Sequence, residues 1–407
     1  MGYTKHRKLL ERVQLTQSKS SIWTSKNLTQ SILLSLTASV FVSGSAMSSV
    51  SEKVSVSGFG SIYAGQTLKS GEVLMADFAS VGQYSNELSF KPDTILGLQA
   101  STVLSDDLSV TAQVVLKGSD DFEPEMTSLY FTYRPSDHLT LMAGRRPIPM
   151  YYFSEYYEVG YAYPWVRPPA NLYWWYITEM DGLFGSYSFN VAGTDHSISL
   201  FYGNGESKND KMINYYFPIF DRSDEEWTDI AGLNWNIAGD FYDLRFVYFT
   251  HDALRTQYSV GRPNTLGIFK QEFFGIGGSI HLNKFTVLFD YNDVTRESSR
   301  ELGVEVDRVT KWPTYLISLI YNIGNYQPFI SYSKADNSQK DILNDTLGSE
   351  DDYEQHELYS LGLRYNFASN AAFKAQIDIF DDQGFAPRGW DIHGDSTTLT
   401  LGIDFIF

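Results

Sequence analysis

The sequence predicts an all-β protein, namely a transmembrane antiparallel β-barrel of about sixteen strands with long external loops and short periplasmic turns. Three observations lead to this fold class. Apolar and polar residues alternate with a period of two beyond residue 50, and the connections between the alternating segments are short and long in strict turn. No apolar run beyond the N-terminal region reaches the roughly 18 residues that a transmembrane helix needs.

The alternation is clearest at the C-terminus. In segment 397–407, every second residue is apolar, and segments 108–116 and 359–367 follow the same pattern. Successive side chains of a strand point to opposite faces, so each of these segments has one apolar and one polar face. The same test predicts strands near 54–64, 95–103, 108–116, 127–134, 138–144, 180–190, 196–203, 228–236, 241–250, 272–281, 284–293, 312–322, 326–334, 357–366, 372–381 and 397–407.

The connections indicate which end of the barrel faces outward. Short connections rich in Gly, Asn, Asp and Pro are typical of tight hairpins. The long connections cover roughly 65–94, 117–126, 145–179, 204–227, 251–271, 294–311, 335–356 and 382–396. Long loops at one end only are typical of transmembrane barrels, whose short turns face the periplasm. Closure is required as well, because an open sheet edge in hydrocarbon leaves backbone groups unpaired.

The N-terminal region has the pattern of a secretory signal peptide. Residues 1–30 are polar and basic, residues 32–42 are uncharged and mostly apolar, and the small residues Gly44, Ser45 and Ala46 follow. The apolar stretch is too short to anchor the chain as a membrane-spanning helix. We therefore expect a signal peptide at 1–46 that is cleaved after Ala46, and an exported domain at 47–407.

Composition excludes several classes of protein. The 407 residues contain no cysteine, which excludes disulfides and cysteine-ligated metal centres. The 49 acidic residues outnumber the 31 basic ones, and this balance argues against nucleic-acid binding. Removal of residues 1–46 sharpens the formal charge from −18 to −23. Phosphate-binding loops and metal-ligand motifs are not found, so no cofactor is expected.

The sixteen-segment pattern across residues 54–407, the long third loop and the terminal Phe407 resemble the Gram-negative outer-membrane porin family. The stretch 160–169 of the third loop departs from general porins and is more similar to porin-like proteins of environmental proteobacteria. The resemblance implies an outer-membrane location in contact with lipid and lipopolysaccharide, and a homotrimer. It also implies that the last strand, with Phe405 and Phe407, is read by the outer-membrane assembly machinery.

The third long loop, 145–179, is the segment in which we expect the function to reside. It contains twelve aromatic residues, so it is expected to pack against other parts of the protein, and in porins this loop folds into the barrel. The predicted constriction residues are Arg145, Arg146, Glu155, Glu158 and Arg167. The predicted pore-wall residues are Arg245, Arg364, Lys374, Asp378 and Asp404. Opposed charges at a narrow point favour small dipolar solutes; the alternative is that the arginines only hold the loop to the wall.

The expected function is a water-filled channel for passive diffusion of small hydrophilic solutes and ions, with no enzymatic activity. The negative charge favours a mild preference for cations. Three alternatives stay open: a substrate-specific channel that uses the aromatic loop, an adhesion barrel with a plugged lumen, and a barrel enzyme. An enzyme would use a pair such as His251 and Asp252, or Asp391 and His393. The carboxylates of the acidic segments 221–226 and 350–357 are candidates for binding divalent cations together with the phosphates of lipopolysaccharide, although the segments show no regular ligand spacing.

Overall fold

The computed structural model describes residues 54–343, 355–383 and 394–407. Its chain divides into Met1–Val54 and Ser55–Phe407, and the fold described below is that of the second unit. The predicted signal peptide and the pair Asp391 and His393 lie outside the described residues.

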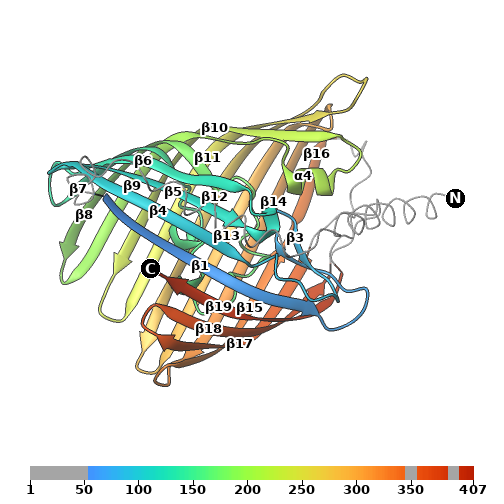
Figure 1. Ribbon diagram of the computed structural model, residues 1–407. Coiled ribbons are helices and arrows are strands. Elements are labelled where there is room, and N and C mark those ends of the chain that lie inside the picture. Colours follow the sequence, from blue (N-terminus) through green and yellow to red (C-terminus); the bar gives the residue numbers. More distant parts are fainter. Residues whose placement is uncertain (1–53, 344–354, 384–393) are drawn as a thin grey trace, which may run out of the picture. The chain divides into compact units, whose positions relative to one another are not determined.

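Sixteen antiparallel strands form one closed barrel, which confirms the predicted fold class (Figure 1). They are β1 (Val54–Thr67), β4 (Ile95–Ser105), β5 (Leu108–Lys117), β6 (Pro124–Tyr133), β7 (Leu139–Pro147), β8 (Glu179–Val191), β9 (Thr194–Ser207), β10 (Arg222–Ala238), β11 (Tyr242–Tyr258), β12 (Thr265–Leu282), β13 (Phe285–Glu301), β14 (Val304–Tyr321), β15 (Tyr326–Asp336) with its continuation β16 (Ser338–Leu343), β17 (Gln355–Ala368), β18 (Ala371–Asp382) and β19 (Ser396–Ile406). β1 pairs with both β4 and β19, so the first and last strands close the barrel side by side.

Two of the predicted long loops are wrong. Segments 251–271 and 294–311 are mostly strand, because β11 and β12 extend to a short turn at 259–264, and β13 and β14 meet at Leu302 and Gly303. In these extensions the outward face is no longer uniformly apolar, since the exposed cross-strand neighbours Asp252 and Lys270 precede the exposed pair Leu254 and Ile268. An alternation test that looks for an apolar face ends where that face ends, although the strand continues.

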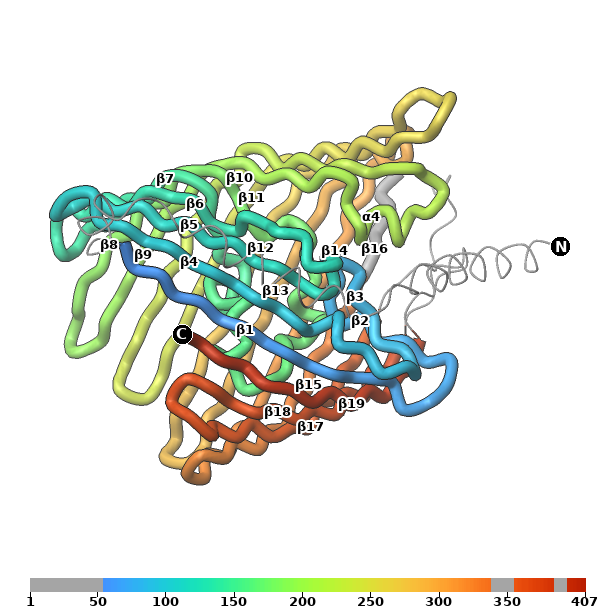
Figure 2. Tube along the Cα trace, viewed as in Figure 1, coloured from blue at the N-terminus to red at the C-terminus, as the bar shows by residue number. Residues whose placement is uncertain are grey.

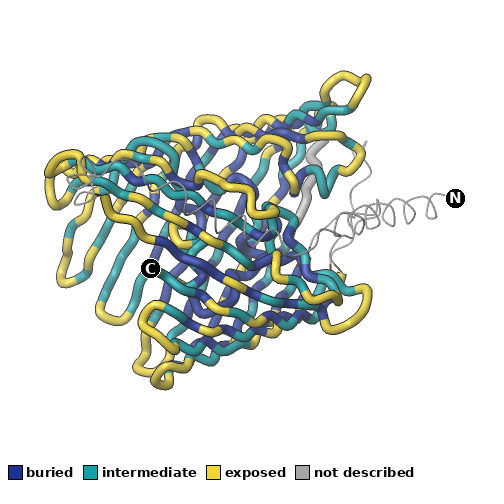
Figure 3. Tube along the Cα trace, in the orientation of Figure 1, coloured by how far each residue is buried: buried dark blue, intermediate teal, exposed yellow. Residues whose placement is uncertain are grey.

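The two faces of the barrel differ as a membrane protein requires. Large apolar side chains such as Leu200, Ile317 and Leu361 are exposed on the outside, whereas polar residues such as Asp290, Ser318 and Thr400 are buried on the inside. Buried and exposed positions therefore alternate along the strands (Figure 3). Among the described residues, no helix has the length and apolar character needed to cross a membrane.

Loops fill much of the lumen. The first long loop carries the hairpin β2 (Leu74–Asp77) and β3 (Gly82–Tyr84), and the short helix α4 (Lys211–Tyr216) precedes β10. The third loop, predicted at 145–179, spans residues 148–178 in the structure, between β7 and β8. It contains two short 3-10 helices, Ser154–Tyr156 and Gly160–Ala162. Side chains of these loops and of the wall form one apolar cluster that includes Phe78, Tyr151, Trp165, Trp175, Ile213, Phe249, Phe273 and Trp312. In Figure 2 the green trace of the third loop is seen behind the near strands, whereas β2, β3 and α4 lie at the right-hand ends of the strands.

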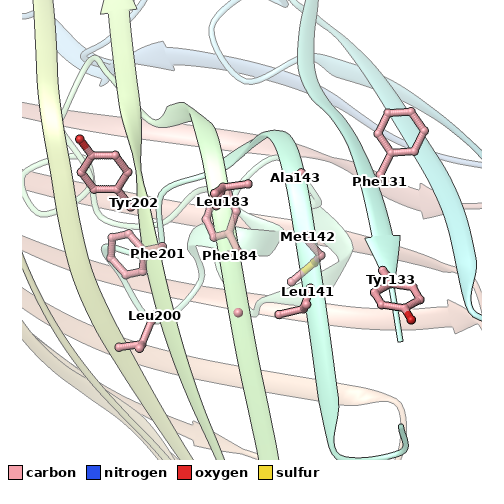
Figure 4. Close-up of a pocket in the computed structure, with 11 residues that line it drawn as sticks. Phe131, Tyr133, Leu141, Met142, Ala143, Leu183, Phe184, Leu200, Phe201 and Tyr202 are labelled. Carbon is pink, nitrogen blue, oxygen red and sulfur yellow. The ribbon is translucent and has the colours of Figure 1, made fainter. Parts of the chain in front are cut away.

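The outer wall has an apolar hollow of about 440 Å³ over β6, β7, β8 and β9. Small residues at Ala143 and Gly185 form its floor, and larger side chains such as Tyr133, Leu141 and Tyr202 surround it (Figure 4). This hollow lies on the face that a lipid or another protein chain would contact.

Candidate pore constriction

The third loop crosses the lumen and is hydrogen-bonded to strands far apart in the wall. The backbone N–H of Tyr152 donates to Asp290 of β13 at 3.1 Å. The indole N–H of Trp165 donates to Ser331 of β15 at 2.7 Å. The backbone N–H of Val166 donates to Gln376 of β18 at 2.8 Å. The aromatic residues of the loop are thus placed inside the barrel.

Two basic wall residues hold the backbone of the loop. Lys374 Nζ donates to the carbonyl oxygens of Gly160 at 2.7 Å and Trp165 at 2.5 Å, and lies 2.7 Å from Asp404. Arg364 Nη1 donates to the carbonyls of Tyr161 and Tyr163 at 2.8 and 3.0 Å. All three side chains, Lys374, Arg364 and Asp404, are buried. These predicted pore-wall residues therefore lie beneath the loop and do not border open water.

Arg167, in the middle of the loop, fixes it to β18 and to the first long loop. Its guanidinium forms ion pairs with Asp93 and with Asp378, the second at 2.6 Å. Asp378 also accepts a hydrogen bond from Ser360 at 2.6 Å. Because all members of this group are buried, each charge depends on the others for stabilisation. For Arg167 and Arg364 the structure thus supports the alternative that arginines hold the loop.

The two glutamates of the loop face basic wall residues. Glu155, a predicted constriction residue, pairs at 2.8 Å with Arg245 of β11, a predicted pore-wall residue. Glu158 pairs instead with Lys117 of β5 at 2.7 Å, and Lys117 is also 3.5 Å from Glu125. Lys117 was not predicted, although it continues the inward face of Thr111 and Gln113 two positions beyond Val115. Extending the alternation past residue 116 would have found it.

The pKa values of the two loop carboxyls shift in opposite directions. Burial opposes ionisation of Glu155, but the neighbouring Arg245 guanidinium holds its pKa below the ordinary value. Burial raises the pKa of Glu158, and the nearby ammonium of Lys117 only partly offsets this effect. The pKa values of the two glutamates differ because Asp77 and Glu125 add negative charge around Glu158, which disfavours its ionised form.

A narrow slot lies between the third loop and strands β5 and β6. Its volume is about 50 Å³, which leaves room for only a few waters, and its lining includes Asp77, Lys117, Glu158 and Glu179. Below it lies a vestibule of about 1160 Å³, whose lining includes Phe407 and Asn370 at the end with the short turns. Gln113, Glu155 and Val159 line both spaces, so the slot and the vestibule adjoin.

Arg145 does not belong to this site. It pairs with Asp181 through two hydrogen bonds of 2.9 and 2.7 Å on the outer face of β7 and β8. Its cross-strand neighbour Leu129 is likewise exposed outward. Consecutive residues of a strand point to opposite faces, so Arg146 points inward and Arg145 cannot.

The structure does not assemble the catalytic pair considered from the sequence. His251 is buried in the lumen and stacks on Trp227 at 3.9 Å between ring centroids, whereas the adjacent Asp252 is exposed. Within the acidic segment 221–226, Arg222 pairs with Asp224 and Arg255 with Glu225. In the described part of the chain, no group of three or more His, Asp or Glu residues is placed to hold a metal ion.

A closed barrel with an apolar outer face, a polar inner face and an inserted loop beside a polar slot defines a membrane-spanning pore protein. The Gram-negative porin family model matches residues 35–384, and the chain belongs to this family. Membership makes the protein an outer-membrane channel for passive diffusion. No curated protein sequence matches the chain.

Solved structures with the same fold cover 87% of this chain. They include the trimer form of in-vitro folded OmpT of Vibrio cholerae (11% identity, TM-score 0.52, 99% of that chain covered). The outer membrane channel DcaP of Acinetobacter baumannii has 10% identity and a TM-score of 0.57, with 97% of that chain covered. An anion-selective porin from Comamonas acidovorans has 12% identity and a TM-score of 0.50, with 99% of that chain covered. At these identities the likeness concerns the fold.

Proposed function

We propose that the exported chain, after removal of residues 1–46, is a non-enzymatic porin for small hydrophilic solutes and ions, with the third loop as its constriction. The observation that carries this proposal is the polar slot between the loop and β5 and β6, which adjoins the vestibule. The loop supports it because its backbone is fixed to the wall by Lys374 and Arg364. A rigid loop defines one aperture.

The test is conductance of the purified protein in planar bilayers, combined with swelling of proteoliposomes in sugars of graded size. We expect small unitary conductance steps and uptake that falls smoothly with solute size, because the slot is narrow. Saturable uptake of one solute class would favour the substrate-specific alternative, and a complete lack of conductance would favour a plugged barrel.

The charge of the slot predicts its ion selectivity. Lys117 is the one basic residue among the described residues that line it, and Glu158 and Glu179 are on the same lining. Replacing Lys117 with Gln is expected to raise the potassium-over-chloride permeability ratio severalfold, since negative charge at a constriction attracts cations. The reversal potential in a potassium chloride gradient measures the ratio. Lys284→Gln, at an exposed short turn, is the matched control; an unchanged ratio in Lys117→Gln would remove the slot from the ion path.

We also propose a homotrimer in which the outer face of β6 to β9 contacts a second copy. Arg145 and Asp181 expose 41% and 59% of their side chains beside the apolar hollow. An Arg on the lipid-facing side of a barrel costs about 0 to 1 kcal/mol near the membrane interfaces and about 2 to 4 kcal/mol at the midplane, so a protein neighbour is a better environment than lipid for this pair. The trimer form of Vibrio cholerae OmpT has the same fold.

Reversing the charge of Asp181 tests this contact. Asp181→Lys places two positive charges side by side and is expected to convert the trimer to monomers, as measured by native mass spectrometry. Glu305→Lys reverses another exposed ion pair, that with Arg300, and is expected to leave the trimer intact. If wild-type protein is monomeric, or if Asp181→Lys remains trimeric, the proposed interface is wrong.

A further inference from the structure

Arg146 is an inward-pointing guanidinium without an anionic partner. Its Nη1 donates to the sulfur of Met142 at 3.1 Å, and its buried Nε has no hydrogen-bond partner. Across the described residues, no carboxylate lies within ion-pair distance of it, whereas Arg167, Arg245 and Arg255 each have one. A partly desolvated cation with unused donors is the chemistry of a site awaiting an anion.

Two aromatic rings hold this guanidinium in place. Its central carbon lies 5.0 Å from the ring centroid of Tyr130 and 5.0 Å from that of Phe184. Cation–π contacts of this kind orient the guanidinium plane without neutralising its charge. Glu155 of the third loop pairs directly with Arg245, and the charge of Arg146 stabilises the same carboxylate only at longer range. The guanidinium of Arg146 is therefore positioned and, among the described residues, has no carboxylate in direct contact.

Arg146 borders the vestibule of about 1160 Å³, whose lining also holds Arg245 and the carboxylates Glu155 and Asp243. Glu155 is paired with Arg245, and the neutral lining residues suit the body of an organic anion. The side-chain amides of Gln99 and Gln113 provide polar groups, and the rings of Phe153 and Tyr156 provide apolar surface. Ligand sites typically combine a few placed polar groups with aromatic walls. The side chain of Tyr156 is exposed in this space, so its ring is accessible to a solute.

We propose that the vestibule binds small carboxylates with an aromatic or apolar body, with Arg146 as the residue that recognises the carboxylate. Guanidinium and carboxylate match in a two-bond geometry, and the aromatic lining takes the body of the ligand. This inference rests on the proposed porin function and names the solute class that the channel retains on its periplasmic side.

Binding of benzoate to the purified protein in detergent, measured by isothermal titration calorimetry and ligand-observed NMR, tests the site. We expect millimolar binding of benzoate, and binding at least about tenfold weaker for the neutral isostere benzyl alcohol and for inorganic phosphate. Arg146→Gln is expected to weaken benzoate binding by at least about tenfold, and Arg146→Lys by less, since it keeps the charge but loses the planar fork.

Arg300→Gln is the matched control, because Arg300 carries the same charge but pairs with Glu305 on β13 and β14, outside both the vestibule lining and the proposed subunit contact. It should bind benzoate as the wild type does. Equal benzoate binding by Arg146→Gln and wild type, or equal binding of benzyl alcohol and benzoate, overturns the proposal. If Arg146→Gln fails to fold, which the loss of heat-modifiable mobility on gels would reveal, Arg146→Lys and the comparison of benzoate with benzyl alcohol on wild-type protein still decide it.

Conductance separates this inference from the proposed function. A protein that conducts but does not bind benzoate is a porin without this site. A protein that binds benzoate through Arg146 but shows no conductance has the site, and the porin proposal then fails.

Discussion

Replacing Arg167 with methionine is expected to release the middle of the third loop from β18 and to destabilise the protein strongly. The guanidinium lies buried between Asp93 and Asp378, and its removal leaves two buried carboxylates without their cation. Breaking a buried ion pair from one side typically costs about 3 to 5 kcal/mol. The midpoint of urea unfolding in detergent should fall accordingly, and single-channel records should show larger, fluctuating conductance.

The matched control for Arg167→Met is Arg300→Met. Arg300 also pairs with a carboxylate, that of Glu305, but both residues are solvent-accessible and the pair lies on strands β13 and β14 far from the loop. Exposed pairs contribute little, about 0 to 1 kcal/mol. If the two variants unfold at the same urea concentration and conduct alike, Arg167 does not hold the loop.

The strands could be predicted from the sequence because their signal is local. Each of the sixteen alternating segments coincides with a strand, and the apolar half of each pattern faces outward. The errors occur where the outward face changes character. β11 to β14 extend beyond the regular apolar band, and there apolar residues lie on both faces, such as Leu254 outside and Phe269 inside, so the two faces show little contrast.

The site was only partly accessible to sequence reasoning, because its contacts join residues far apart in the chain. Arg167 meets Asp93 and Asp378, which are 74 and 211 positions away. No local pattern encodes such a pairing. The alternation of side-chain direction along a strand does decide between Arg145 and Arg146. Neighbouring residues of a strand face opposite sides, so at most one of the two could point into the lumen.

Burial inside the lumen is the second property that alternation does not reveal. Lys374 was expected to line the pore wall, but the third loop covers it together with Gln376, and both side chains form hydrogen bonds with the loop. Charged residues of this wall therefore divide into two groups. One group fixes the loop, and the other, at Lys117, Arg245 and Arg146, borders the slot and the vestibule.

Replacing Trp165 with alanine is expected to destabilise the protein and loosen the third loop, as Arg167→Met does, but through lost packing instead of lost charge. The indole is fully buried, contacts the rings of Phe153 and Tyr163, and donates to Ser331. Truncating a buried tryptophan typically costs about 3 to 5 kcal/mol, because the surrounding structure closes the cavity only in part. Such a cavity under the loop is also expected to widen the path for ions.

Trp165→Phe separates the packing contribution from the hydrogen bond. It retains most of the ring volume and loses only the N–H that Ser331 accepts, so its urea midpoint and conductance should remain near the wild-type values. A Trp165→Phe variant as unstable as Trp165→Ala would mean that the bond to Ser331 holds the loop. Wild-type conductance in Trp165→Ala would mean that ions pass on the β5 and β6 side alone, where the slot lies and where the loop keeps its contact through Lys117.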